Sequence, residues 1–388
     1  MLNKKTNLTV NIKNIRFRES ILIFIFTLVF TLFSGAQEKR IPPDSTIIKI
    51  IFAGDVMGHM PQIEAAFDPE TRSYNFDTTF YFVKPFLDSA DLAIANLETT
   101  LSGSPYSGYP HFCSPDAYAP SLKRAGFGML VMANNHAADK GGAGIKRTLN
   151  IIDSTEIMHT GTFRSKEERD SLYPLIVERK GIRLAFLNYS YGTNGESVPA
   201  PYIVNVIDTT LIKRDLEKAR ILQADFIITV LHWGEEYERN PNKEQKRLAR
   251  WIFKHGCDMI IGSHPHVIQP VEIVIPDSSD LTEPKLVLYS LGNFVSNQRD
   301  RYKNGGLLFG VKLIKKKVTK LYQYAFLPVW VTKTPGSKPG FYMITPQAWK
   351  AYQTDFGYSI TIEQALNEFF DDTREHMKNV PEMSGPGW

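Results

Sequence analysis

Residues 47–59 read IIKIIFAGDVMGH, an apolar run that passes directly into a polar, glycine-containing stretch. Similar apolar runs, rich in β-branched residues, recur at 91–95, 128–133, 183–189, 225–231, 258–261 and 285–290. Segments with helical spacing separate several of them, at 79–89, 115–125, 142–153, 211–222 and 242–255. Because a strand that is apolar along its whole length is buried on both faces, the alternation predicts an α/β fold with buried sheets.

Six of these runs end in polar residues whose side chains can bind metals or protons. The stretches are 54–59, 96–98, 134–136 with Asp139, 232–235, 262–266 and 290–294. In open α/β sheets, ligands bind outside the carboxyl ends of the strands. We therefore expect these side chains, which are distant in the sequence, to meet in one crevice.

Histidines are concentrated in these strand-end stretches, which hold His59, His136, His232, His264 and His266. Imidazole binds Zn and Fe readily, whereas carboxylate and amide oxygens suit harder ions such as Mn. The mixed set therefore predicts one or two divalent ions (Mn, Zn or Fe), and two ions bridged by a carboxylate would form a hydrolytic site. Taken singly, each stretch has a simpler interpretation as a turn or a packing histidine. Their recurrence at successive strand ends favours the metal site.

The N-terminal residues 1–36 carry the whole positive charge of the chain. They hold five of the 45 basic residues and one of the 41 acidic residues, so the remainder has no net charge. The basic balance is thus no argument for a nucleic-acid partner.

The same segment is typical of an export signal. A basic stretch precedes the apolar run 21–33, and the small residues of 34–36 follow. This order predicts a signal peptide over 1–36 and a polar linker over 37–46. The alternative is an uncleaved membrane anchor, although the run is shorter than the ~20 residues that a span needs. In both cases we expect an exported protein, periplasmic or at the cell surface.

The main domain is expected over 47–332, and it ends in a strand pair at 306–314 and 318–332. Residues 333–388 are expected to form a C-terminal appendage with one amphipathic helix near 361–378. Cys113 and Cys257 are interpreted as buried thiols, with a disulfide as the alternative. Four histidines lack the strand-end setting and are expected to be surface or structural: His111, His159, His255 and His376.

The strand-end stretches, in their order along the chain, resemble the CapA family. Those proteins are associated with poly-γ-glutamate capsule synthesis in bacteria, and the resemblance covers about residues 47–300. The family is similar to calcineurin-like metallophosphoesterases. The resemblance therefore implies a four-layer αββα sandwich with a two-metal site.

The resemblance also implies a role for each residue. Asp55 and His266 would ligate one metal, and Glu98 would bridge, with Asn96 as the alternative. The second metal would be held by Asn135, His232 and His264. His59 is a further candidate ligand, because it stands four residues after Asp55 where the phosphoesterases place a histidine two residues on.

The implied catalytic group is His136, oriented by Asp139, which would protonate the leaving group. Asn293 and Arg299 are candidates for substrate binding. Further basic residues near these loops could also bind an anionic polymer, although ordinary solvated charge is the simpler interpretation: Lys140, Lys146, Arg147 and Arg301.

Two functions stay open at this point. One is a metal-dependent hydrolase that acts on an anionic envelope polymer or a phosphorylated precursor, at a phosphoester or amide bond. The other is a non-catalytic accessory that binds polymer, or membrane-bound capsule synthesis components, through the same fold. The pairing of His136 with Asp139 favours the enzyme, because pure binding does not need it.

Overall fold

The computed structural model describes residues 44–388 apart from 276–282, 335–339 and 358. The predicted signal peptide and nearly all of the predicted linker lie outside the described residues. Within the described part of the chain, no helix is both long and apolar enough to cross a bilayer.

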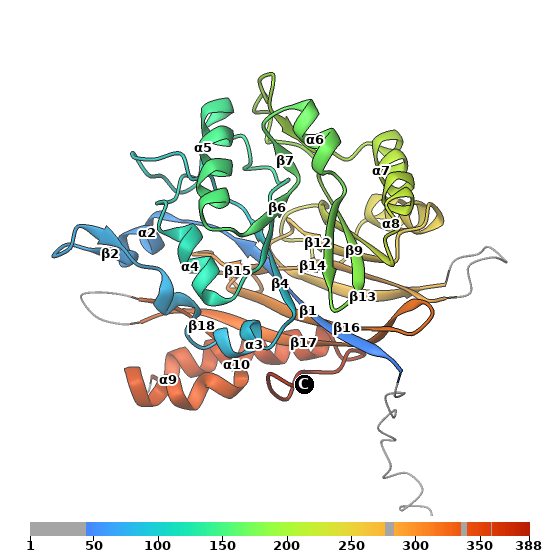
Figure 1. Ribbon diagram of the computed structural model, residues 1–388. Helices are drawn as coiled ribbons and strands as arrows, with labels where there is room; N and C mark the ends of the chain where they lie inside the picture. The colour runs from blue at the N-terminus through green and yellow to red at the C-terminus, as the bar shows by residue number, and fades with distance from the viewer. Residues whose placement is uncertain (1–43, 276–282, 335–339, 358) are drawn as a thin grey trace, which may run out of the picture. The chain divides into compact units, whose positions relative to one another are not determined.

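Two β-sheets organise residues 46–388 (Figure 1). The first has the order β18 (Phe341–Ile344), β17 (Thr319–Lys333), β16 (Gly305–Lys315), β1 (Thr46–Val56), β4 (Leu92–Leu97), β5 (Met129–Val131) and β6 (Met158–Thr160), with β15 (Asn293–Val295) on β1. The second has the order β13 (Ile268–Val274), β14 (Lys285–Leu291), β12 (Met259–Ser263), β11 (Phe226–His232), β9 (Ile182–Ser190) and β8 (Leu175–Arg179). The central strands of each sheet run parallel, so their carboxyl ends share one edge.

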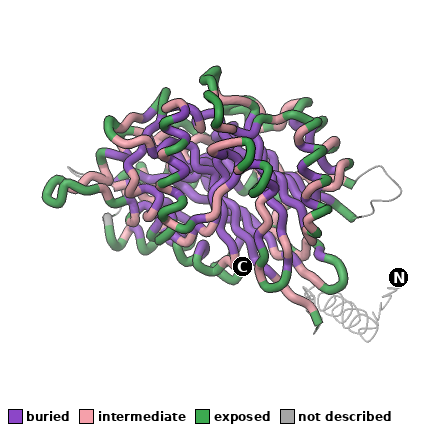
Figure 2. The backbone as a smooth tube through the Cα atoms, turned by 45° about the horizontal axis from the view of Figure 1, so that its top comes forward, coloured by how far each residue is buried: buried purple, intermediate pink, exposed green. Residues whose placement is uncertain are grey.

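Alternating side chains of the strands separate the layers. In β1, Ile50 and Phe52 pack between the two sheets against Phe186 of β9, whereas Ile51 and Ala53 face a helical layer. That layer contains α3 (Lys84–Asp88), α4 (Tyr118–Ala125) and α5 (Gly141–Ser154). The opposite layer, on the second sheet, contains α7 (Thr209–Ile221) and α8 (Lys243–Lys254). Figure 2 shows the strands as the buried interior, and the expected four-layer αββα sandwich is confirmed.

All nine predicted strands are present, including the pair at 306–314 and 318–332, and four of the five predicted inter-strand helices match helices of the structure. The exception is 79–89, which is divided into η1 (Asp77–Phe80) and α3. Pro85 lies in the first turn of α3, a position that proline favours, so a separate helix begins there. Several short elements were not predicted: α2 (Met60–Ala66), β2 (Phe67–Asp68), β3 (Ser73–Tyr74), β7 (Thr162–Phe163), α6 (Lys166–Leu172) and β10 (Ile203–Val204). Cys113 and Cys257 are buried free thiols, as expected.

The C-terminal residues correct one expectation. They form η2 (Pro346–Ala348), α9 (Trp349–Phe356) and α10 (Ile360–His376), so there are two α-helices instead of one. They are also no appendage, since β18 extends the first sheet and Phe369 and Phe370 join the core between the sheets. Tyr352 of α9 is buried in the same core, and this aromatic content explains why the segment packs inward.

The two sheets are joined at the edge where the parallel strands end. After β14 of the second sheet, Gly292 turns with a φ of 72°, and β15 then pairs with β1 of the first sheet. The Asp55 backbone N–H donates to the Gly292 carbonyl at 3.1 Å. A Cβ on Gly54 would lie 1.9 Å from that carbonyl oxygen, so this close approach requires glycine.

We expect Gly54→Ala to destabilise the fold by about 3 kcal/mol, because the clash is with backbone that cannot rotate away. Gly192→Ala is the matched control, since an added Cβ there meets nothing within 4 Å. It should change the unfolding free energy by no more than about 0.5 kcal/mol. Urea unfolding followed by circular dichroism measures the stability of both variants. Equal unfolding midpoints would show that the close approach of the Gly292 carbonyl does not constrain residue 54.

Candidate metal centre

The side chains predicted at the strand ends converge at this edge, and they are buried. Asp55 comes from β1, Asn96 and Glu98 from the end of β4, His232 from β11, and His264 and His266 from the loop after β12. Asn135, His136 and Asp139 follow β5, and Asn293 begins β15. The most exposed of these residues, Asp139, keeps 9% of its surface. The structure therefore brings these side chains, which are distant in the sequence, together at one edge of the sheets.

Asn96 is the hub of the polar network. Its Nδ2 donates to Asp55 Oδ1 at 2.8 Å and to Glu98 Oε2 at 3.2 Å. Its Oδ1 accepts from Asn134 Nδ2 at 3.1 Å. An amide that holds two carboxylates apart leaves their remaining oxygens for another partner, so Asn96 is better suited to positioning ligands than to being one.

Glu98 is a buried carboxyl that lies between two imidazoles of the site. Its side chain is fully buried, and burial followed by the nearby Asp55 charge raises the pKa of its carboxyl well above the usual range. Its Oε1 lies 3.6 Å from His232 Nε2 and 3.8 Å from His266 Nε2, and no hydrogen-bond partner for it is found among the described residues. A buried carboxylate without a cation is costly. The position between two imidazoles therefore fits an oxygen that shares a metal ion.

Two imidazoles of the site, those of His232 and His264, are held neutral. Burial, followed by the neighbouring His264 and His266, lowers the pKa of His232 well below its usual value. Burial and His266 lower the pKa of His264 to about 3. His232 is oriented by Asn135 Oδ1 at 2.7 Å and Ser263 Oγ at 3.0 Å. Neutral imidazole is the form that binds metals, so these rings are ready to act as ligands at neutral pH.

His266 joins the histidine loop to Asp55. Its Nδ1 lies 3.1 Å from Asp55 Oδ2. The ligand atoms of Asp55, Glu98 and His266 all lie within 4.8 Å of one another, as do those of Glu236, His264 and His266. His264 and His266 adopt positive φ angles of 97° and 58°, a strained backbone that flanks Pro265. Such strain is concentrated at functional sites, where surrounding structure maintains it.

His136 and Asp139 form a separate pair beside the ligand cluster. His136 Nδ1 lies 2.8 Å from Asp139 Oδ2, which also accepts the Phe112 backbone N–H at 2.6 Å. The carboxylate accepts, so Nδ1 carries the proton and Nε2 is the atom that can exchange one. The Phe112 ring packs edge-on against the imidazole, 4.7 Å between centroids, and fixes its orientation. The pair is arranged for proton transfer.

His59 is not brought into the ligand cluster. It is the N-cap residue of α2, its Nδ1 accepts the Asn297 backbone N–H at 3.3 Å, and its ring packs on Phe112. It belongs to neither group of three ligands among the described residues. Burial, opposed by a hydrogen bond with Gln62, lowers its pKa to about 4. The chain leaves β1 at Val56, and Asn297 and Phe112 then hold the His59 imidazole outside the ligand cluster.

The two candidate substrate residues differ in what they offer. Asn293 is paired in register with Asp55, and its Nδ2 donates to Gln298 and to the Lys303 carbonyl, both at 2.8 Å. Arg299 donates to the carbonyls of Val331 and Ser296, at 2.6 and 3.1 Å. Its guanidinium is thereby engaged in holding the loop, so a role in substrate binding stays a prediction for both residues.

Sequence reasoning missed Tyr191 and Glu236. Tyr191 follows β9, and its ring lies over His264 with 4.5 Å between centroids. The rule that located the other residues, a polar group directly after a buried strand, would have found it at the end of 183–189. Glu236 lies two residues beyond Gly234 in an exposed loop, where an acidic residue carries no distinguishing signal.

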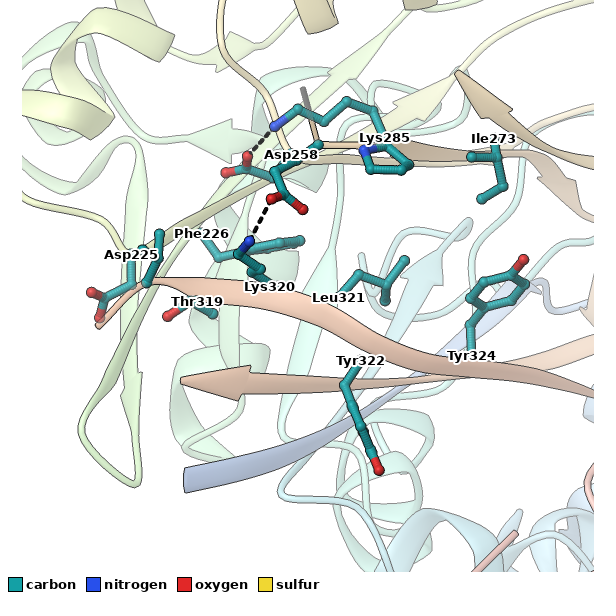
Figure 3. Close-up of a pocket in the computed structure, with 13 residues that line it drawn as sticks. Asp225, Phe226, Asp258, Ile273, Lys285, Thr319, Lys320, Leu321, Tyr322 and Tyr324 are labelled. Carbon is teal, nitrogen blue, oxygen red and sulfur yellow. Dashed lines mark hydrogen bonds and ion pairs between the residues drawn. The ribbon is translucent and has the colours of Figure 1, made fainter. Parts of the chain in front are cut away.

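A hollow of about 500 Å³ lies elsewhere, at the opposite ends of the same strands (Figure 3). Asp225 and Asp258, which line it, precede β11 and β12, whereas His232 and Ser263 end those strands. Its acidic residues pair with lysines: Asp225 with Lys315, Asp258 with Lys285 and Glu283 with Lys320. This hollow is therefore distinct from the candidate metal centre.

The protein is a four-layer α/β sandwich with His, Asp, Glu and Asn gathered at the carboxyl ends of its strands, and side chains of these types can ligate divalent metals. The chain belongs to the bacterial capsule synthesis protein PGA_cap family, whose model matches residues 49–298. The capsule biosynthesis protein CapA of Bacillus anthracis is 26% identical over 305 residues, 74% of this chain and 70% of that protein. The PGA biosynthesis protein CapA of Bacillus subtilis is 26% identical over 290 residues, 71% of each chain.

Similar solved structures are nucleotidases and a phosphoesterase. The NAD nucleotidase of Haemophilus influenzae has a TM-score of 0.47 at 12% identity, over 85% of this chain and 68% of that chain. The calcineurin-like phosphoesterase YfkN of Bacillus subtilis has a TM-score of 0.41 at 12% identity, over 85% of this chain and 99% of that chain.

Metal binding should release protons at pH values below the raised pKa of Glu98, because this carboxyl must ionise to bind an ion. Since its folded pKa is raised, Glu98 stabilises the metal-free fold at low pH, and that contribution is lost as pH rises through the raised pKa. Metal affinity should accordingly rise with pH over the same range. Calorimetric titration in two buffers of different ionisation enthalpy, repeated over a range of pH, measures the proton release. Release that does not grow as the pH falls would contradict the raised pKa of Glu98.

Proposed function

We propose that this protein is a metal-dependent hydrolase of the bacterial cell envelope that cleaves a phosphoester or amide bond during synthesis or anchoring of an anionic capsular polymer such as poly-γ-glutamate. The observation that carries the proposal is Glu98, whose buried Oε1 lies between two imidazoles without a hydrogen-bond partner among the described residues. The names of the relatives support the polymer. An exported location, periplasmic or at the cell surface, is part of the same proposal.

Six residues would form the metal site, and Asn96 would position two of them. Asp55, Glu98, Asn135, His232, His264 and His266 would hold one or two divalent ions. When bound, such ions supply Lewis acidity and activate water at neutral pH. Asn96 keeps Asp55 and Glu98 in place.

His136 would give a proton from Nε2 to the leaving group. Asp139 holds Nδ1 and stabilises the charged imidazole that forms when Nε2 takes a proton again. His136 and Asp139 are almost completely buried, so little water competes for them. This strengthens their hydrogen bond and the attraction between the carboxylate and the charged imidazole.

A substrate panel tests the proposal. The full chain is loaded with Mn²⁺, Zn²⁺ or Fe²⁺ and assayed on p-nitrophenyl phosphate, bis-p-nitrophenyl phosphate, γ-glutamyl-p-nitroanilide and poly-γ-glutamate. We expect hydrolysis of at least one, lost with a chelator and restored by metal. Metal-loaded protein that binds poly-γ-glutamate but leaves every bond intact would instead identify the non-catalytic accessory. Loaded protein that does neither would also refute the hydrolase.

Removing the metal should lower stability. A ligand held at 100 times its dissociation constant stabilises the fold by about 2.7 kcal/mol. For a unit of about 340 residues, with an unfolding entropy of about 2.1 cal/mol/K per residue, that corresponds to a fall in Tm of about 4 °C on chelation. Differential scanning calorimetry with and without EDTA measures it. An unchanged Tm in protein known to be loaded would show that the ions do not bind within the fold.

A further inference from the structure

Glu236 lies on a loop that is fastened to the histidine loop of the metal centre. The Tyr237 backbone N–H donates to the Pro265 carbonyl at 2.8 Å, between His264 and His266. Gln269 Nε2 donates to the Glu238 carbonyl at 2.7 Å. These two bonds fix the two residues that follow Glu236. They therefore hold its carboxylate over the centre, although the residue is exposed.

The other end of the loop is fixed as well. Gly234 has a φ of 93°, and a Cβ there would lie 2.7 Å from the Gln245 side chain, so the turn after Trp233 requires glycine. Asn242 Nδ2 donates to Glu235 Oε1 at 3.3 Å, and this places Glu235 toward the start of α8. Of the two adjacent glutamates, only Glu236 is in the ligand group.

The carboxylate of Glu236 meets two imidazoles. Its ligand atom and those of His264 and His266 all lie within 4.8 Å of one another. His264 is 3% exposed, and its Nδ1 has no hydrogen-bond partner within the described ranges. An unpartnered buried imidazole beside a carboxylate and a second imidazole is the arrangement that a divalent ion satisfies.

We propose that Glu236 is a ligand of this centre, together with His264 and His266. The inference rests on the proposed metal binding. It adds a third carboxylate to Asp55 and Glu98, and this one faces solvent. Three carboxylates carry a charge of −3 when ionised, which two divalent ions would outweigh and one would not. Glu236 therefore favours two ions, with a positive surplus that suits an anionic substrate.

The test uses the full chain, freed of metal and titrated with Mn²⁺ while free Mn²⁺ is followed by electron paramagnetic resonance. Loss of outer-shell partners already costs about 10–100-fold in metal affinity. Glu236→Gln, which removes a ligand, should therefore weaken at least one Mn²⁺ site by about tenfold or more. Glu236→Asp should recover part of that loss. Glu235→Gln is the matched control and should bind as the wild type does.

A second readout does not depend on affinity or activity. With Co²⁺ in place of Mn²⁺, the visible absorption spectrum of Glu236→Gln should differ from that of the wild type, and that of Glu235→Gln should not. If the wild type binds metal and Glu236→Gln matches it in affinity and spectrum, the inference is wrong while the proposed function stands. If the wild type itself binds neither metal, the proposed function fails.

Discussion

Glu98→Gln should lose metal binding by more than about 100-fold while leaving the fold intact. One oxygen of this carboxyl lies within 4 Å of both His232 Nε2 and His266 Nε2, so its loss should affect every ion that the centre holds. An outer-shell change alone costs about 10–100-fold, and loss of a shared ligand should exceed that. Isothermal calorimetry with Mn²⁺ or Zn²⁺ measures the dissociation constants.

The same substitution should not lower the stability of the metal-free protein. Glutamine removes a group whose ionisation is opposed by burial, and its carbonyl can still accept from Asn96. Asp215→Asn is the matched control, because Asp215 is another buried carboxylate, paired with Arg169 at 2.6 Å. It should cost about 3–5 kcal/mol of stability by leaving Arg169 uncompensated, yet keep metal affinity. Glu98→Gln with wild-type affinity would remove Glu98 from the ligand set.

His136→Ala should lower the rate of hydrolysis by about 10²–10⁴-fold with metal affinity unchanged. His136 belongs to a pair with Asp139 and not to either group of three ligands. A general acid matters most when the leaving group is poor. The loss should therefore be larger for an alkyl ester or amide than for a p-nitrophenyl ester of the same acid.

His159→Ala is the control for that variant. His159 Nε2 lies 2.9 Å from Asp153 Oδ1, so it is also a histidine paired with an aspartate, but on β6 beside α5. It should leave hydrolysis unchanged. Equal losses for poor and good leaving groups in His136→Ala would contradict proton donation and indicate a role in binding instead.

Much of the fold follows from the sequence because its central strands are apolar throughout. Residues 47–53 and 225–231 need burial on both faces, and only stacked sheets covered by helices supply it. The C-terminal segment was misjudged because its buried aromatic residues, such as Tyr352 and Phe369, are spread among polar ones. Their partners are on other strands and cannot be read locally.

The same distinction applies to the centre. Asp55, Glu98 and His266 could be located because each lies at or just after the end of a buried strand at the shared edge. His59 was misleading because spacing along the chain says nothing of the contacts with Asn297 and Phe112 that hold its imidazole elsewhere. The role of Glu236 could not be predicted from the sequence. Its position depends on the hydrogen bond that the backbone N–H of Tyr237 donates to the Pro265 carbonyl.

The central claim is that this edge of the sandwich holds divalent metal, and metal content tests it most directly. The full chain is purified without chelators, incubated separately with Mn²⁺, Zn²⁺ and Fe²⁺, desalted, and measured by inductively coupled plasma mass spectrometry beside Glu98→Gln. We expect one or two equivalents in the wild type and a marked loss in the variant. A wild-type protein that keeps none of the three metals, or a variant that keeps as much as the wild type, would contradict it.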